Sequence, residues 1–322
     1  MILVITTSED QTADFLCRSL QKDGLATLRF DTDIDAPSLR SRYVVGEPEL
    51  RIREHSISPA DVDHIWYRRP KPLVISGEFR GKAEHLHTQA EMTEAIEGFL
   101  SHVPEKKWMN HPARNAVASH KLEQLTRAAQ KGLYVPDTLM TQDPEEAKAF
   151  FTKHRGQVIV KPLASGYLER DDGCDSLVYT NAIANEDLQH LVRVLSSPTL
   201  FQVRVQKCTD VRICVVDAEM TAVAMFKEEA GQQILDIRRD NMAGVKYEPI
   251  SVPPDVRAQL HALMKSYSLR FGAIDMAVSD SGRWTFFEIN PNGQWAWLDI
   301  VGGANIAAQF SRAFHSRAKT QR

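Results

Sequence analysis

The sequence predicts a mixed α/β (α+β) protein, and three patterns in its 322 residues lead to this fold class. The chain opens with an apolar strand, an amphipathic helix and a second strand, which is a β-α-β arrangement. Helices with recognisable start and stop signals and short apolar runs follow through the middle. Near the C-terminus, two alternating apolar runs flank a polar tetrapeptide, which predicts an antiparallel hairpin.

The opening segment is expected to resemble half of a Rossmann domain. Residues Ile2 to Ile5 predict a strand, Asp10 to Lys22 a helix that stops at Gly24, and Ala26 to Phe30 a second strand. The first turn carries Thr6-Thr7-Ser8-Glu9 in place of a glycine-rich dinucleotide fingerprint. NAD binding is therefore not expected there.

Further elements follow in the middle of the chain. Leu50 to Tyr67 predicts strand, Glu84 to His102 a long helix, and Ser119 to Lys131 an amphipathic helix. The run Asp143-Pro144-Glu145-Glu146 is typical of a helix start, with an N-cap, a proline at the first helical position and a capping box. The polar run from Ala164 to Ser176 is expected to form a hairpin flap.

The C-terminal part is expected to be strand-rich and to end in a helix. We expect three domains: an N-terminal domain at 1–108, a central lobe with the flap at 109–200, and a C-terminal lobe at 201–322. The expected elements of the last domain, apart from the hairpin, are Phe201 to Lys207, Val211 to Val216, Met220 to Phe226, Pro254 to Arg270 and Ala304 to His315.

Composition excludes several classes of protein. The hydrophobic fraction of 43% supports well-buried cores, and the net charge of -3 gives no basic field that would favour a nucleic-acid partner. No apolar stretch is long enough to span a bilayer, so no membrane partner is expected. The cysteines show neither disulfide nor zinc spacing, which indicates a reduced, cytoplasmic protein; they are Cys17, Cys174, Cys208 and Cys214.

The C-terminal hairpin places oxygen ligands together. If Ser281 and Gly282 form its turn, Asp280 faces Arg283, and counting outward sets Asp275 opposite Glu288 on one face, with Asn290 two residues further along. Opposed carboxylates favour a compensating cation, and two carboxylates with an amide oxygen suit Mg²⁺. The alternative is a solvated outer face. Apolar residues expected on the same face argue against it; they are Ala273, Ala277 and Phe286.

Two lysines and two arginines are candidates for binding phosphate. Lys161 ends an almost wholly apolar strand, where an unpaired ammonium is costly, and Lys121 lies in the first turn of a helix. Arg212 and Arg238 lie near strand ends, each beside an aspartate. The alternatives are lysines whose heads reach water and arginines in surface ion pairs.

Together these motifs resemble the ATP-grasp superfamily of carboxylate ligases over nearly the full chain. More narrowly they resemble the graspetide (microviridin-type) peptide maturases. The segments that carry the narrower resemblance are WYRRP (66–70), KWMNHP (107–112), KLEQLTRAAQKGLYVPDTL (121–139) and EINPNGQWAW (288–297). The resemblance implies an ATP-grasp fold with a Rossmann-like pre-ATP-grasp domain at the N-terminus.

The resemblance also implies roles for the candidate residues, with ATP and Mg²⁺ as cofactors. Lys121 and Lys161 would contact ATP phosphates, while Arg212 and Arg238 would steady the terminal phosphate or the acyl phosphate. The metal ligands would be Asp275, Glu288 and Asn290. Adenine would meet the stretch that contains Gln202, Val203 and Val205, although Val203-Arg204 stands where relatives commonly carry glutamate and an aromatic or apolar residue.

The implied activity is ATP-dependent joining of Asp or Glu side chains in a precursor peptide to Ser, Thr or Lys side chains of the same peptide, as esters or amides. Arg68 and Arg69 are candidates for gripping the acidic side chains of that peptide, with a solvated basic turn as the alternative. The expected partner is a leader plus an acidic core, and the resemblance alone implies a homodimer. Two alternatives stay open: a ligase acting on a small molecule or adding amino acids to a protein, and a non-catalytic nucleotide- or peptide-binding module.

Overall fold

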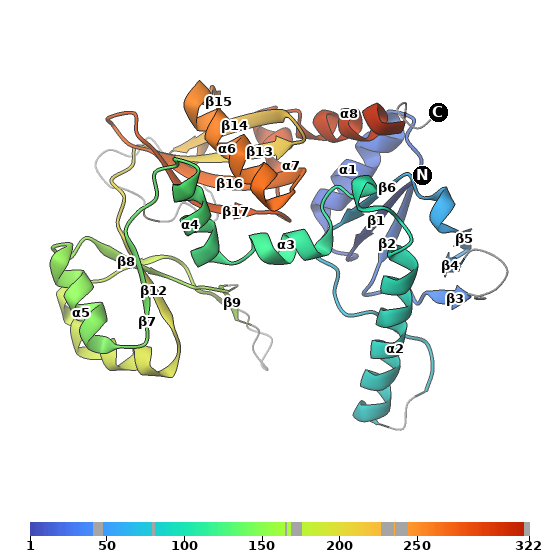
Figure 1. Cartoon of the computed structure of the whole chain (residues 1–322), viewed down its shortest axis with the longest axis horizontal. Helices are drawn as coiled ribbons and strands as arrows, with labels where there is room; N and C mark the ends of the chain where they lie inside the picture. Colours follow the sequence, from blue (N-terminus) through green and yellow to red (C-terminus); the bar gives the residue numbers. More distant parts are fainter. Residues whose placement is uncertain are drawn as a thin grey trace.

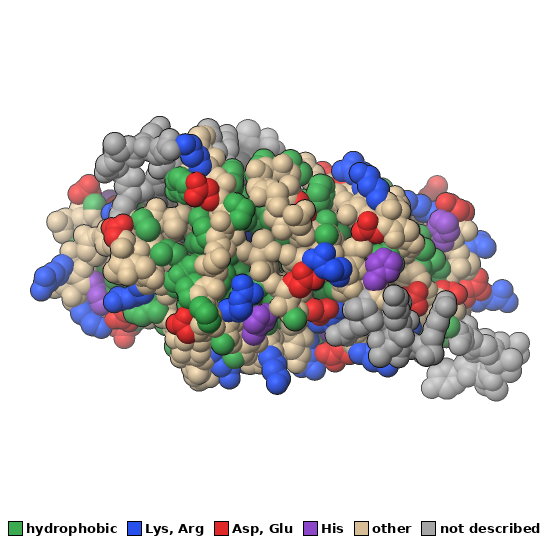
Figure 2. All heavy atoms as spheres, turned by 90° about the horizontal axis from the view of Figure 1, so that it is seen from above, with side chains coloured by type: hydrophobic (Ala, Val, Ile, Leu, Met, Phe, Trp, Pro, Cys, Tyr) green, Lys and Arg blue, Asp and Glu red, His purple; other side chains and the backbone are tan. Residues whose placement is uncertain are grey.

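The computed structural model describes residues 1–40, 48–78, 81–164, 166–168, 176–226, 235 and 244–318. These residues form an N-terminal domain, a small lobe and a large antiparallel sheet (Figure 1). The mixed α/β (α+β) fold class predicted from the sequence is confirmed. None of the helices in these ranges is long and apolar enough to cross a membrane. On the face shown in Figure 2, acidic and basic side chains are interspersed, without a field of one sign.

The N-terminal domain has a parallel sheet at its centre. Its elements are β1 (Ile2–Thr6), α1 (Gln11–Lys22), β2 (Thr27–Asp31), β3 (Ser38–Arg40), β4 (Glu49–Ile52), β5 (His55–Ile57), η1 (Pro59–Asp61), β6 (His64–Tyr67) and α2 (Lys82–Leu100). The strand order is β2-β1-β6, and the predicted β-α-β opening is confirmed. Helix α1 packs on one face of this sheet, while β4, β5 and α2 pack on the other.

The segment predicted to contain strand at 50–67 consists of several short elements. In chain order these are β4, β5, η1 and β6, and Arg53 takes a left-handed conformation (φ 54°) that turns the chain back between β4 and β5. Strands β3, β4 and β5 then pair antiparallel in their own small sheet. Only β6 joins β1 in the central sheet.

A helical connection leads from the N-terminal domain to the small lobe. It consists of η2 (Glu105–Lys107), α3 (Pro112–Ala118) and α4 (Lys121–Gln130), and Gly132 beyond α4 has a φ of 87° that suits a helix end. The predicted helix at 119–131 is therefore confirmed as α4. In Figure 1, α3 and α4 run beneath the large sheet.

The small lobe has a core of its own. Its antiparallel sheet has the order β11-β8-β12-β7, and α5 and η3 pack against one face through Phe150, Phe151 and Leu191. The short strands β9 and β10 pair where the flap was expected. The elements are β7 (Thr138–Thr141), α5 (Pro144–Lys153), β8 (Val158–Lys161), β9 (Tyr167–Leu168), β10 (Ser176–Leu177), β11 (Asn181–Ala182), η3 (Asn185–Ser196) and β12 (Thr199–Val203).

The large sheet is antiparallel with the order β15-β14-β13-β16-β17. Its elements are β13 (Thr209–Val216), β14 (Glu219–Phe226), β15 (Lys246–Ile250), α6 (Pro254–Tyr267), β16 (Phe271–Val278), β17 (Trp284–Asn290), α7 (Ala296–Gly302) and α8 (Ile306–Ala318). Helices α4 and α6 cover one face, and α1, α7 and α8 cover part of the other. The second face therefore joins the sheet to the N-terminal domain.

The turn between β16 and β17 is one residue longer than predicted. Val278 pairs with Trp284, and the Ser279 N–H donates to the Arg283 carbonyl at 3.1 Å, while Gly282 takes a φ of 78°. The expected two-residue turn with Asp280 facing Arg283 is therefore wrong. A glycine in the left-handed region near the end of a three-residue loop is a common hairpin geometry.

A β-bulge then restores the predicted register. Met276 pairs with Phe286, whereas Asp275 pairs with Glu288, so Phe287 is an extra residue on β17. The predicted opposition of Asp275 and Glu288 is confirmed, because the longer turn and the bulge offset one another. The expectation that Phe286 shares their face is wrong. Phe286 is fully buried with Met276 in the core between the sheet and helices α4 and α6.

Aromatic packing joins the N-terminal domain to the large sheet. The Phe310 ring of α8 stacks on Trp295 with centroids 5.1 Å apart, and it lies 5.3 Å from Trp66 of β6 and 5.2 Å from Phe271 of β16. The Asn110 side chain adds polar contacts, donating to the Phe271 carbonyl at 2.8 Å and accepting the Phe271 N–H at 3.1 Å. The start of β16 and the loop after β17 are thus joined to the N-terminal domain by one continuous support.

Arg68 lies inside this support and is fully buried. Its Nε donates to Asp10 at 2.6 Å, and its Nη1 donates to the carbonyl groups of Asn292 and Gly293 at 3.1 and 2.9 Å. Burial lowers the pKa of the Arg68 guanidinium, and the Asp10 carboxylate opposes that shift. The expectation that Arg68 grips peptide side chains is therefore corrected: the residue ties the start of α1 to the loop after β17.

Replacing Arg68 by alanine should lower the free energy of unfolding by about 3 kcal/mol or more, because it leaves the Asp10 carboxylate buried and unpaired. Urea denaturation followed by circular dichroism measures the change. Arg312→Ala removes an exposed pair with Glu219 and should change stability little. Equal free energies of unfolding for the two variants would contradict the stabilising role of the Arg68 contacts with Asp10 and the loop after β17.

Candidate active site

Three candidate ligands share one face of the large sheet. Asp275 pairs with Glu288 and Ala273 pairs with Asn290 across β16 and β17, so the side chains of Asp275, Glu288 and Asn290 leave the same face. Glu288 and Asp275 are each half-buried and lie near a cation. These three side chains therefore form a polar, charged surface on strands β16 and β17, at one edge of an otherwise apolar sheet.

Cations from two different elements lie against the two carboxylates. The Lys121 Nζ, at the first turn of α4, lies 3.6 Å from Glu288 and donates to the Pro162 carbonyl of the small lobe at 2.8 Å. The Arg212 Nε, on β13, lies 3.2 Å from Asp275. Such pairing offsets the repulsion between opposed carboxylates on adjacent strands.

Lys161 of the small lobe approaches the same surface of β17. Its Nζ donates to the Gln202 side-chain oxygen at 2.8 Å and lies 4.5 Å from the centre of the Phe287 ring. Gln202 is buried, and its amide nitrogen donates to the Thr138 hydroxyl at 2.9 Å, which fixes the orientation of the amide. Lys161 is thus held by neutral groups and points towards the large sheet.

Burial lowers the pKa of Lys161 to about 8. The neighbouring positive charges of Lys121 and Lys207 lower it too, whereas Glu288 and Asp275 raise it. An ammonium that is desolvated and lies among other cations favours a bound anion.

The chain between the small lobe and the large sheet carries the residues predicted to meet adenine. Strand β12 ends at Val203, whose N–H donates to the Asp137 carbonyl at 2.9 Å, and the Arg204 N–H donates to the Gln157 carbonyl at 2.9 Å. The Val203 amide is therefore used within the protein. The Val205 N–H makes no hydrogen bond to any residue that the structure describes.

Arg69 lies on the same side of the molecule as Arg212. Although the Arg69 side chain is exposed to solvent, neighbouring protein atoms partly desolvate its guanidinium and lower its pKa; the Asp10 charge opposes this shift, and the Arg212 charge adds to it. Arg69 itself has a φ of 46° directly after β6, and it forms no hydrogen bond or ion pair within the described ranges. Arg238, predicted beside Arg212, lies outside the described residues.

The predicted metal ligands have the chemistry of a hard-cation site. Within the ranges that the structure describes, no group of three or more His, Cys, Asp or Glu side chains could hold a metal. The predicted trio has two carboxylates and an amide instead, and Asn290 accepts the Asn292 N–H at 3.0 Å, which orients its side-chain oxygen. Oxygen-only donors of this kind fit Mg²⁺, which completes its shell with water and phosphate.

Sequence reasoning missed several groups beside this site. Phe287 faces Lys161 only because of the β-bulge, and the Pro162 carbonyl enters only through the fold. Lys207 lies close to Lys161, and its Nζ binds Asp210 at 2.6 Å. The spacing of Lys207 and Asp210 was a signal in the sequence, whereas a bulge leaves no comparable mark.

The N-terminal part of the chain matches a known family. A family model described as the MvdD pre-ATP grasp domain matches residues 1–116. No curated protein matches the sequence. The family match covers the parallel sheet of the N-terminal domain and reaches into α3.

Solved structures are similar along nearly the full chain. The macrocyclase MdnC from Microcystis aeruginosa MRC, bound with precursor peptide MdnA, is 24% identical, with 98% of this chain and 99% of that chain covered and a TM-score of 0.85. A RiPP-associated ATP-grasp ligase from Chryseobacterium gregarium, in complex with ADP and a leader and core peptide, is 27% identical, with 98% and 96% covered and a TM-score of 0.84. The ATP-grasp ligase PsnB, complexed with minimal precursor, Mg and ADP, is 20% identical, with 99% and 98% covered and a TM-score of 0.75.

These similarities confirm the ATP-grasp fold with an N-terminal pre-ATP-grasp domain. The resemblance to RiPP ATP-grasp ligases is confirmed as well, since such proteins are the structural neighbours. Nucleotide and magnesium occur in structures of this fold.

Lys161 should titrate near pH 8, well below an ordinary lysine. Reductive ¹³C-methylation followed by NMR titration measures the pKa of each lysine. The resonance of Lys161 is identified as the one that is lost in the Lys161→Arg variant. Gln202→Glu places a carboxylate at the Lys161 Nζ and should raise that pKa. A titration close to pH 10.5 in the unaltered protein would contradict the environment described here.

Proposed function

We propose that this chain is an ATP-dependent ligase that activates Asp or Glu side chains of a precursor peptide and joins them to Ser, Thr or Lys side chains. The observation that carries the proposal is the opposition of Asp275 and Glu288 beneath cations from two other parts of the chain, Lys121 and Lys161. Full-length similarity to the RiPP-associated ligase from Chryseobacterium gregarium supports a peptide substrate.

The charges of the site suit a nucleoside triphosphate. Lys121 and Lys161 would meet its phosphates, and the Val205 N–H, which bonds to no described residue, would meet an adenine edge beside the buried Gln202. Asp275, Glu288 and Asn290 would hold Mg²⁺, which supplies charge stabilisation at the phosphate oxygens. With Val203 engaged in the sheet, adenine contact at that residue would involve its carbonyl or side chain.

The reaction needs electrostatic stabilisation and no covalent enzyme intermediate. A substrate carboxylate oxygen attacks the γ-phosphorus, the bond to ADP breaks, and an acyl phosphate forms. A hydroxyl or amine of the peptide then attacks the acyl carbon, and phosphate leaves with the bonding electrons. Arg212 and Arg69 are suited to orient the carboxylate and the transferring group, because guanidinium binds two oxygens at once.

The alternative activities lack comparable support. D-cycloserine synthetase DcsG, a solved structure of similar fold, has a TM-score of 0.57 at 14% identity, so it speaks for the fold alone. A non-catalytic binding module would have little need for opposed carboxylates beside a desolvated lysine. The homodimer and the acidic core of the peptide remain predictions.

Mass spectrometry tests the proposal. The protein is incubated with ATP, Mg²⁺ and synthetic peptides encoded beside its gene, and each ring removes one water, about 18 Da, because carboxylate and nucleophile condense. Loss of water that requires both ATP and Mg²⁺ is the expected result. ATP turnover with a small carboxylate and no change in any peptide would favour the small-molecule alternative.

Glu288→Gln should abolish peptide-dependent ADP formation while the fold is retained, because the charge that balances Lys121 and would bind metal is lost. A coupled ADP assay measures turnover, and circular dichroism monitors the fold. Glu248→Gln on the exposed side of β15 makes the same chemical change away from the site and should leave turnover intact. Near-normal ADP formation by the Glu288 variant would refute the assignment.

ADP affinity should weaken as pH rises through about 8, because the free Lys161 ammonium loses its proton there and only the charged form attracts phosphate. Isothermal titration calorimetry between pH 7 and 9.5 measures the trend. Lys161→Arg keeps its charge over this range and should bind ADP with little dependence on pH. The same decline in both proteins would assign the effect to another group.

A further inference from the structure

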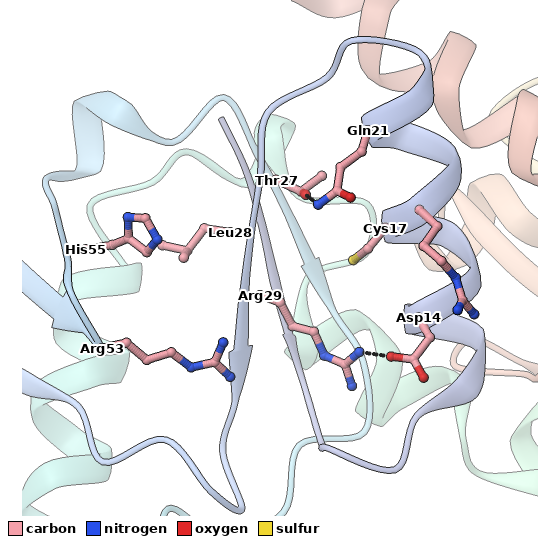
Figure 3. A pocket seen from close by; sticks show the side chains of 9 residues that line it. Asp14, Cys17, Gln21, Thr27, Leu28, Arg29, Arg53 and His55 are labelled. Carbon is pink, nitrogen blue, oxygen red and sulfur yellow. Dashed lines mark hydrogen bonds and ion pairs between the residues drawn. The ribbon is translucent and has the colours of Figure 1, made fainter.

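The edge strands β2 and β17 differ in what lies against their outer sides. A pocket of about 490 Å³ is lined by residues of β2, of α1 and of the turn from β4 to β5 (Figure 3). Its charges are largely paired, since Arg29 binds Asp14 and Asp31, and Arg53 binds Asp31 and Asp35. These pairs leave little charge to select a ligand there. The edge of β17, in contrast, is covered by a buried polar side chain.

This side chain is Gln124 of α4, which is only 2% exposed. Its Oε1 accepts the Ile289 N–H at 2.9 Å, while its Nε2 donates to the Ile289 carbonyl at 2.9 Å and to the Ala118 carbonyl at 2.6 Å. One N–H and two carbonyl groups around the amide leave it one satisfactory orientation. No described strand pairs with this side of β17, so Gln124 takes the place of a neighbouring strand at Ile289.

The residue that Gln124 holds lies between two predicted metal ligands. Ile289 stands between Glu288 and Asn290 in the sequence, and its side chain is buried on the other face of the sheet, in the core with α4 and α6. In an antiparallel pair alternate residues face the partner strand, so the main-chain groups of Glu288 and Asn290 face β16 while those of Ile289 face Gln124. Gln124 therefore holds the main chain from which both ligands project.

A second contact to the same edge lies on the other side of the β-bulge. The Phe286 N–H donates to the Tyr134 carbonyl at 2.8 Å. Residues three apart in a regular strand face opposite edges, so Phe286 and Ile289 both bond outward only because Phe287 is an extra residue between them. Without the extra residue, the Glu288 side chain would turn to the core face. The two outer contacts thus match the register that keeps Glu288 in the site.

Helix α4 also has contacts that do not involve Gln124. The Arg127 Nη1 donates to the Ser266 carbonyl of α6 at 2.7 Å, and the Arg127 guanidinium lies 4.1 Å from the centre of the Tyr267 ring. These contacts hold α4 against α6, and Lys121 lies at the start of the same helix. A substitution of Gln124 is therefore expected to loosen β17 and to leave Lys121 in place.

We propose that Gln124 is a positioning residue for the metal site, because it holds β17 at Ile289 so that Glu288 and Asn290 present their oxygens together to Mg²⁺. Apolar packing of Ile289 keeps the strand on the core but is non-directional, whereas the three hydrogen bonds of the amide fix the orientation of the main chain. The inference rests on the proposed function for the identity of the ion. The hold on β17 stands on the geometry alone.

Isothermal titration calorimetry of ADP binding to the full chain, with saturating Mg²⁺ and with EDTA, tests the inference. Mg²⁺ should tighten ADP binding by the unaltered protein, and Gln124→Met should lose about tenfold or more of this gain, because partners that orient metal ligands commonly matter by that factor. ADP affinity in EDTA should stay close to that of the unaltered protein. Gln309→Met removes a buried amide on α8 that bonds to Thr221 of β14, and should keep the full gain.

Gln124→Glu is a second variant with nearly the same shape. Its carboxylate can accept the Ile289 N–H, but its other oxygen would face the carbonyls of Ile289 and Ala118, so the gain from Mg²⁺ should fall here as well. Circular dichroism checks the fold of each variant, and urea denaturation measures its stability. A variant that is only less stable would bind ADP with fewer active molecules and keep the full gain from Mg²⁺.

Amide hydrogen exchange in the nucleotide-free protein, followed by NMR, tests the hold on β17 without metal. In Gln124→Met the N–H groups of Glu288 and Asn290 should exchange about tenfold or more faster relative to those of β13, because the strand opens locally. Gln309→Met should leave this ratio unchanged. Faster exchange at Ile289 alone, or a full gain from Mg²⁺ in both Gln124 variants, overturns the inference.

The unaltered protein separates this inference from the proposed function. If its ADP affinity gains nothing from Mg²⁺, the metal assignment of the proposed function falls, and the positioning role falls with it. If it gains affinity from Mg²⁺ and forms rings in a peptide, but both Gln124 variants keep the gain, only the positioning role falls.

Discussion

The repulsion between Asp275 and Glu288 is the constraint on which the candidate site depends. Two carboxylates opposed on neighbouring strands persist only with compensating charge. That charge comes from Arg212 on the next strand and Lys121 on α4. The placement of α4 beneath the sheet is thereby linked to the chemistry on its surface.

Lys161 extends this link to the small lobe. Neutral partners hold it, namely the Gln202 oxygen and the Phe287 ring, and burial lowers its pKa to about 8. A carboxylate partner would neutralise the charge and leave less for a phosphate. The choice of an amide at position 202 therefore tunes the site for a polyanion.

Local pattern sufficed to predict much of the fold. The β-α-β opening and helix α4 followed from periodicity and from glycine stops, and the opposition of Asp275 and Glu288 followed from counting along a hairpin. The count succeeded through two offsetting departures, a longer turn and a bulge at Phe287. Neither has a signature strong enough to predict, because a bulge is decided by packing on both faces of the strand.

Side-chain roles that depend on tertiary contact could not be predicted. Adjacent arginines 68 and 69 look alike in the sequence, yet Arg68 is fully buried against Asp10 while Arg69 is exposed. The alternation of β6 and the left-handed conformation at Arg69 separate them. Arg53 shows the same limit, since its φ of 54° makes the turn between β4 and β5, which the predicted strand content of this segment did not locate.

The separate core of the small lobe has a mechanical consequence. The chain leaves the large sheet after Tyr134 and returns at Cys208, and between these points Phe150, Phe151 and Phe201 pack among themselves. Contacts across the gap include the Lys121 bond to the Pro162 carbonyl and the Lys161 contact with Phe287, which water and a polyanion can replace. The core of the small lobe therefore does not depend on the position of the lobe relative to the large sheet, and a displacement of the lobe would separate Lys161 from Phe287 and Lys121 from the Pro162 carbonyl while that core stays packed.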